Sequence, residues 1–122
     1  MKRALVVDDA AFMRIALRRI LEKSGFEVVG EADTGMKAVQ QYRLLKPDIV
    51  TMDLTMPELG GVDAIKMIKS IDNNARIIVI SSMGHEINVK EAIIAGAVSF
   101  IVKPFKEEVI SKQLMNLGEK IV

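Results

Sequence analysis

Three acidic residues in this chain of 122 residues each follow a short apolar run. Asp8 and Asp9 come directly after residues 4–7, and Asp53 comes directly after residues 49–52. Apolar runs of this length, rich in β-branched side chains, are typical of strands that are buried on both faces of a parallel sheet. A proline and a glycine pair follow Asp53, so we expect this carboxylate to lie where a strand ends and a loop begins. In open parallel sheets, ligands bind at that edge.

The chemistry expected of such carboxylates is metal binding and phosphoryl transfer. Carboxylates that converge in one crevice repel each other unless they share a cation. A ligand set made only of oxygen atoms suits magnesium, which keeps several waters and also binds phosphate oxygens. A carboxylate can also attack phosphorus and form an aspartyl phosphate. Because Asp53 stands alone while Asp8 and Asp9 form a pair, we expect the pair on the metal side and Asp53 as the phosphoryl acceptor.

Two further polar side chains follow predicted strands. Ser81 comes after the apolar residues 77–80, and Lys103 comes after residues 99–102. The Ser81 hydroxyl can donate a hydrogen bond to a phosphoryl oxygen, and the Lys103 ammonium is a compact positive charge suited to the same group. Taken singly, each residue is as well explained by an ordinary role in a turn or in solvent. Their occurrence at one edge of a sheet favours a site for a phosphoryl group.

Five strands, each followed by a helix, are predicted to position these residues. The first helix carries Phe12, Ile15, Ile20 and Leu21 as its apolar stripe. Right-handed crossovers between parallel strands place helices on both faces of the sheet, which predicts a doubly wound α/β fold of three layers in a single domain over residues 1–122. The strands are expected at residues 4–7, 26–30, 49–52, 77–80 and 99–102, and the helices around residues 12–21, 38–45, 64–71, 86–95 and 106–120.

The composition argues against several other classes of protein. Seventeen basic and sixteen acidic residues leave a net charge of +1, which gives no electrostatic support for binding nucleic acid or a membrane surface. The chain has no cysteine and one histidine, so a thiolate or zinc site is not expected. The apolar run at residues 4–7 is too short for a signal peptide or a membrane span. We therefore expect a cytoplasmic protein.

As a set, these motifs resemble the receiver domain of two-component response regulators, and the resemblance covers the whole chain. The single-domain chemotaxis members of that family are the most similar, through residues 8–14 and 51–58. The motifs that carry the resemblance are VDD at residues 7–9, MDLTMP at residues 52–57, ISS at residues 80–82 and FIVKPF at residues 100–105.

The resemblance implies a flavodoxin-like fold with strand order 2-1-3-4-5. It implies that Asp53 accepts phosphate from the phosphohistidine of a sensor histidine kinase. Asp9, Asp53 and the main-chain carbonyl of Thr55 would bind Mg²⁺ directly, and Asp8 would assist through water. Lys103 would pair with the phosphoryl group.

A switch is also implied by the family. Ser81 would move toward the phosphoryl group, and Phe100 would follow it inward. Ser81 stands where the family often has threonine, Ser82 where it often has alanine, and Phe100 where tyrosine is frequent. The surface of the fourth helix, fifth strand and fifth helix would then change its affinity for partners.

The implied partners are a chemotaxis kinase, a flagellar motor switch protein and a phosphatase. The domain would act as a monomer and catalyse only its own phosphoryl transfer and dephosphorylation. A single-domain phosphorelay receiver that serves sporulation or another output is the alternative.

Three other classes need features that the sequence lacks. A phosphatase with an aspartyl nucleophile needs an Asp-x-Asp pattern after the first strand, where Asp8, Asp9 and Ala10 stand instead. A flavin or dinucleotide binder needs a phosphate-binding loop at the same place. A DNA-binding regulator needs an output domain, and the chain ends at Val122, so we expect no output domain.

Overall fold

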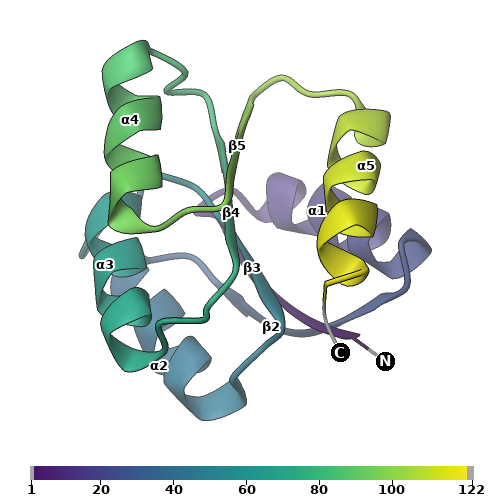
Figure 1. Cartoon of the computed structure of the whole chain (residues 1–122), viewed down its shortest axis with the longest axis horizontal. Helices are drawn as coiled ribbons and strands as arrows, with labels where there is room; N and C mark the ends of the chain where they lie inside the picture. Colours follow the sequence, from purple (N-terminus) through teal and green to yellow (C-terminus); the bar gives the residue numbers. More distant parts are fainter. Residues whose placement is uncertain (1, 121–122) are drawn as a thin grey trace.

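The computed structural model of the chain describes residues 2–120 and contains one parallel sheet of five strands in the order β2-β1-β3-β4-β5 (Figure 1). The expected strand order is confirmed. None of the helices in this part of the chain is long and apolar enough to cross a membrane. The strands are β1 (Lys2–Val7), β2 (Phe26–Ala32), β3 (Ile49–Met52), β4 (Ile77–Ser81) and β5 (Ser99–Val102), and the helices are α1 (Ala11–Lys23), α2 (Gly35–Leu45), α3 (Gly61–Ile71), α4 (Glu86–Ala95) and α5 (Glu107–Gly118).

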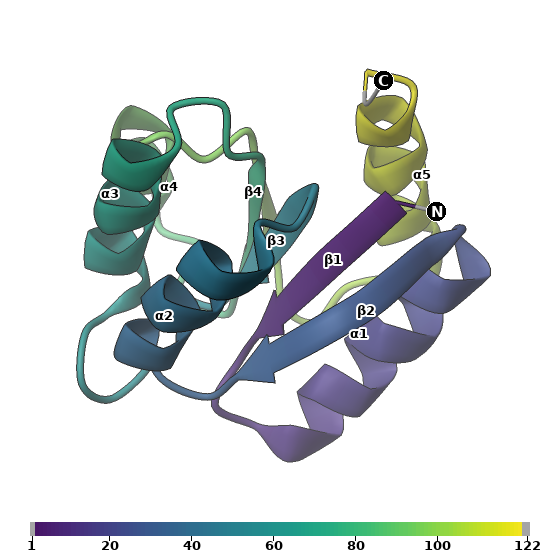
Figure 2. The same cartoon turned by 90° about the horizontal axis from the view of Figure 1, so that it is seen from below.

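The helices cover both faces of the sheet, so the predicted three-layer fold is confirmed (Figures 1 and 2). Helices α2, α3 and α4 lie on one face, where Tyr42 and Ile65 belong to a buried cluster. Helices α1 and α5 lie on the other face, where Leu17 and Leu114 belong to a second cluster. Strand β3 lies between the two clusters, and all four of its residues are buried. This explains why its sequence is apolar without alternation.

The register of the central strands sets the geometry of the sheet edge. Val7 of β1 pairs with Met52 of β3, so the next residues, Asp8 and Asp53, leave the sheet side by side. The amide of Asp53 donates to the main-chain oxygen of Val7 at 3.0 Å. On the other side of β3, strands β4 and β5 end at the same edge. The carboxyl ends of four neighbouring strands therefore converge.

Helix α1 differs from its predicted packing. Phe12 and Ile15 are 72% and 60% exposed, so the prediction that both belong to a buried stripe is wrong. The prediction is confirmed for Ile20 and Leu21, which are buried together with Leu17. The helix begins at Ala11, and its contact with the sheet is made mainly by its second and third turns. The apolar spacing counted Phe12 and Ile15 as core residues because periodicity alone does not distinguish core from exposed apolar residues.

Candidate functional site

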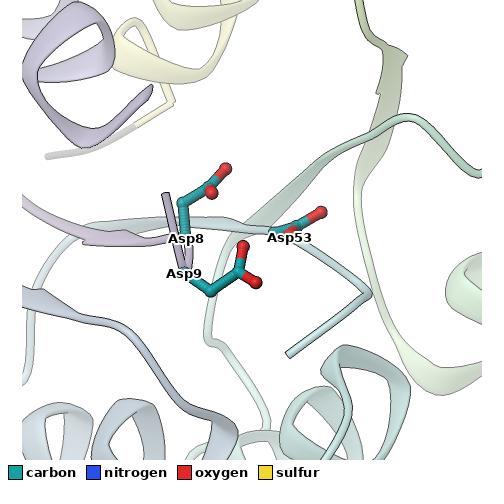
Figure 3. A group of neighbouring side chains, drawn as sticks. All are labelled: Asp8, Asp9 and Asp53. Carbon is teal, nitrogen blue, oxygen red and sulfur yellow. The ribbon is translucent and has the colours of Figure 1, made fainter. Parts of the chain in front are cut away.

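The ends of β1 and β3 bring three carboxylates together. One oxygen from each of Asp8, Asp9 and Asp53 lies within 4.8 Å of the others (Figure 3). Asp8 and Asp53 are only 1% and 3% exposed, whereas Asp9 faces solvent. The structure thus meets the expectation that the acidic residues converge. A cluster with two buried carboxylates and one open side can be approached by an ion from solvent.

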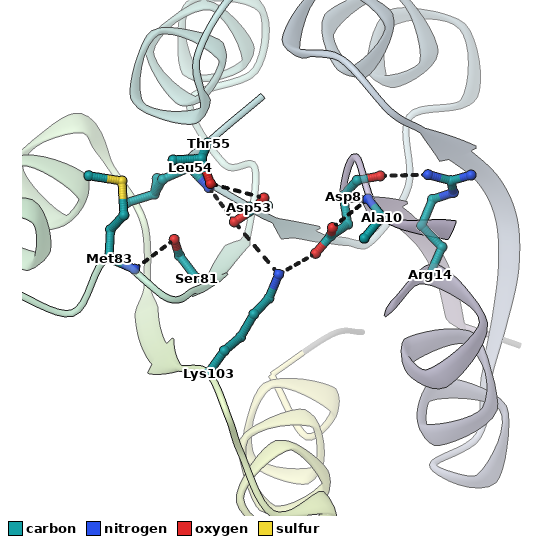
Figure 4. A network of polar contacts seen from close by, with 9 residues as sticks. All are labelled: Asp8, Ala10, Arg14, Asp53, Leu54, Thr55, Ser81, Met83 and Lys103. Carbon is teal, nitrogen blue, oxygen red and sulfur yellow. Dashed lines mark hydrogen bonds and ion pairs between the residues drawn. The ribbon is translucent and has the colours of Figure 1, made fainter. Parts of the chain in front are cut away.

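Lys103 lies between the two buried carboxylates (Figure 4). Its Nζ lies 2.7 Å from Oδ2 of Asp8 and 3.8 Å from Oδ1 of Asp53. The loop after β5 is held by the Lys103 amide, which donates to the main-chain oxygen of Ser81 at 2.9 Å. One lysine cannot balance three carboxylates, so the cluster keeps an excess of negative charge. This excess favours a divalent cation.

The Asp53 carboxylate lies in an environment that disfavours its charge. Burial raises the pKa of Asp53 above its usual value, Lys103 opposes the rise, and the negative charge of Asp8 adds to it. Oδ1 accepts a hydrogen bond from the amide of Leu54 at 2.9 Å, and the Thr55 hydroxyl lies 3.5 Å from Oδ2. A cation or a phosphoryl group that engages this carboxylate therefore relieves an unfavourable interaction.

Ser81 and Phe100 occupy the outer half of the sheet. Ser81 is fully buried at the end of β4, and its Oγ accepts a hydrogen bond from the amide of Met83 at 3.2 Å (Figure 4). Its hydroxyl oxygen is thus engaged by its own loop. Phe100 of β5 is partly buried and packs against the cluster beneath α2, α3 and α4. Thr55 is exposed in the loop after β3.

Two residues that support the site were missed by the sequence analysis. Gly61 was treated only as a turn residue, and Arg14 was included in residues 8–14, which carry the resemblance, without a role of its own. Arg14 donates to the main-chain oxygen of Asp8 at 2.8 Å (Figure 4). No pattern in the sequence indicated this contact, because it depends on how the loop after β1 folds against α1.

Gly61 allows helix α3 to begin directly against the backbone of Asp53. A Cβ at Gly61 would overlap the main-chain oxygen of Asp53 and would lie 2.6 Å from Cα of Leu54. Both neighbours are backbone atoms, which cannot move without shifting Asp53. At Gly60 the nearest atom would be 3.6 Å away, which is an ordinary contact.

Gly61→Ala is expected to lower the free energy of unfolding by about 1–3 kcal/mol, the usual cost of overpacking. The measurement is urea denaturation followed by circular dichroism. Gly60→Ala is the matched control, and it should cost less because its Cβ makes only an ordinary contact with the main-chain oxygen of Leu54. Equal losses in the two variants would show that the contact of Gly61 with the Asp53 backbone is unimportant.

Comparison with known proteins agrees with this geometry. The family model of the response regulator receiver domain matches residues 4–115. The chemotaxis protein CheY of Thermotoga maritima is 59% identical over 118 residues, which cover 97% of this chain and 98% of that protein. CheY of Bacillus subtilis is 57% identical over 106 residues, which cover 87% of this chain and 88% of that protein.

The chain is also similar to a solved structure. A chain in the crystal structure of the CheX-CheY-BeF3-Mg²⁺ complex from Borrelia burgdorferi superposes with a TM-score of 0.92 and is 37% identical, with 96% of this chain and 89% of that chain covered. The chain belongs to the family of response regulator receiver domains.

Proposed function

We propose that this chain is a chemotaxis response regulator in which Asp53 accepts a phosphoryl group from a histidine kinase in the cytoplasm. The observation that carries the proposal is the buried Asp53 carboxylate beside two further carboxylates and Lys103. The CheY relatives, of which 98% and 88% are covered, support the role in chemotaxis. They also support a receiver domain that works without an attached output domain.

The residues at the cluster fit a magnesium ion. Asp8 is already engaged through both oxygens, since Oδ1 accepts from the Ala10 amide at 2.9 Å and Oδ2 pairs with Lys103. As the resemblance to receiver domains implies, Asp9, Asp53 and the main-chain carbonyl of Thr55 would bind the ion directly, and Asp8 would assist through water; the contacts of Asp8 are compatible with that role. When bound, the ion neutralises charge on the phosphoryl oxygens. The CheY chain of the Borrelia complex was solved with Mg²⁺ and BeF3.

The transfer itself needs little beyond positioning and charge. An oxygen of Asp53 attacks the phosphorus of the phosphohistidine, the O–P bond forms, and the P–N bond breaks. The imidazole leaves with the electron pair of that bond. Lys103 lies 3.8 Å from Asp53 and can pair with the oxygens of the transferred group. Its charge favours the more negative product.

The switch would begin at Ser81. Phosphorylation adds about 1.5 to 2 negative charges and new acceptors at Asp53. The Ser81 hydroxyl would leave the Met83 amide, which it contacts at 3.2 Å, and donate to a phosphoryl oxygen. Phe100 would repack, and the surface of α4, β5 and α5 would gain affinity for the flagellar motor switch. The CheX-CheY complex, solved with BeF3 and Mg²⁺, supports a second protein partner, for which we propose a phosphatase.

A peptide from a motor switch protein tests the output. Addition of beryllofluoride and Mg²⁺ is expected to tighten its binding by about 5- to 150-fold, the usual range of coupling between two sites. Isothermal titration calorimetry gives the two affinities. The Asp53→Asn variant is the control and should show one affinity under both conditions. Equal affinities in the unaltered protein would refute the motor switch as the target and favour another phosphorelay output.

A further inference from the structure

Arg14, in the first turn of α1, ties the loop after β1 to strand β2. Its Nη1 donates to the main-chain oxygen of Asp8 at 2.8 Å, and its Nε donates to Oε1 of Glu31 at 3.0 Å. We propose that Arg14 is a positioning residue for the magnesium site, because it fixes the peptide unit between Asp8 and Asp9 and so directs the Asp9 carboxylate. This inference rests on the proposed function of the acidic cluster.

Asp9 is the carboxylate that most needs such support. Within residues 2–120 its side chain makes no hydrogen bond or ion pair, whereas Asp8 is held by Lys103 and Asp53 by the Leu54 amide. The position of the Asp9 carboxylate therefore depends on its main chain. The oxygen of Asp8 and the amide of Asp9 belong to one rigid peptide plane. A hydrogen bond to the Asp8 oxygen therefore also fixes the orientation of the Asp9 main-chain amide.

The guanidinium of Arg14 is itself held in place. Glu31, its partner on β2, also pairs with Nη2 of Arg18 at 2.6 Å. The hydrogen bond from Arg18 is the main cause that lowers the pKa of Glu31, and Arg14 contributes in the same direction. The Arg14 side chain is 20% exposed. A planar guanidinium donates to two acceptors from different nitrogen atoms in fixed directions, whereas the donors of an ammonium group rotate about a single nitrogen.

Positioning and simple charge predict opposite results for Arg14. A positive charge near the cluster repels a cation, so its removal would strengthen magnesium binding if only electrostatics mattered. If Arg14 positions Asp9, its removal weakens magnesium binding. The sign of the change in affinity therefore distinguishes the two roles.

The test is the dissociation constant for Mg²⁺, measured by calorimetry in the full chain. Arg14→Met is expected to raise it about tenfold, the lower end of the usual cost of losing a group that orients a metal ligand. Arg14→Lys keeps the positive charge but loses the planar guanidinium with its two donor directions, and this variant should also bind Mg²⁺ several-fold more weakly. Arg19→Met is the matched control, because Arg19 is exposed on the same helix and forms no ion pair in the described part of the chain. Its constant should stay within about twofold of the unaltered protein.

Two further measurements separate positioning from loss of fold. Each variant is unfolded in urea without metal, and Arg14→Lys decides the question if Arg14→Met does not fold. The rate of phosphoryl labelling in the Arg14 variants should recover at saturating Mg²⁺, because Arg14 touches no reacting atom. Failure of the unaltered protein to bind Mg²⁺ would refute the proposed function itself. If the unaltered protein binds Mg²⁺ and either Arg14 variant binds it equally or more tightly, only the inference about Arg14 is overturned.

Discussion

The Asp53→Asn variant is expected to take up no phosphoryl label from acetyl phosphate and Mg²⁺, under conditions in which the unaltered protein is labelled. The amide of asparagine is a poor nucleophile and carries no charge, so the loss should be complete rather than partial. Labelling is measured by intact-mass spectrometry, which records the added mass, and by proteolytic mapping of the modified residue. The prediction follows from the position of Asp53 beside the acidic pair and Lys103.

Asp63→Asn is the matched control for this experiment. Asp63 is an exposed carboxylate in the first turn of α3, and its loss removes the same charge without touching the cluster. This variant should be labelled as fully as the unaltered chain. Undiminished labelling of Asp53→Asn would place the acceptor elsewhere and would end the proposed function.

Magnesium is expected to stabilise the unaltered protein against unfolding. A ligand that binds only the folded state raises the free energy of unfolding by about 2.7 kcal/mol at a concentration 100 times its dissociation constant. Urea denaturation in chelator and in increasing MgCl₂ measures the effect. Asp53→Asn should lose most of this gain, because the variant lacks one of the carboxylates of the cluster. An equal response to MgCl₂ in the two proteins would contradict the assignment of Asp53 as a ligand.

The same variant should be more stable than the unaltered protein when no metal is present. Burial raises the pKa of Asp53, so the folded state holds this proton more tightly than the unfolded chain does. The contribution of Asp53 to stability is therefore present at low pH and falls as the pH rises through its unfolded and then its folded pKa. The asparagine amide carries no charge at neutral pH, so the gain in Asp53→Asn should appear near pH 7 and disappear in acid. Urea denaturation in chelator at each pH measures this difference.

The strand ends were predictable because they depend on local signals. The buried runs before Asp8 and Asp53 stop at charged residues, and parallel strands present those residues at one edge. The alternation of five predicted strands with five predicted helices indicated the three layers from local signals as well. The strand order came from the resemblance to a family and is confirmed by the structure.

The remaining features depend on how separate elements pack against one another in the folded chain. The exposure of Phe12 and Ile15 is set by where α1 meets the sheet, which apolar spacing does not report. The need for glycine at Gly61 arises from the approach of α3 to the backbone of Asp53. The bond from Arg14 depends on Glu31 of a neighbouring strand. None of these contacts leaves a pattern in the local sequence.

The contact between Lys103 and Asp8 joins residues that are 95 positions apart. A chain still emerging from the ribosome contains Asp8, Asp9 and Asp53 long before it contains that lysine. The contact is thus completed in one late step of synthesis, and a prematurely terminated product that lacks β5 and Lys103 would leave the buried Asp8 carboxylate without its positively charged partner.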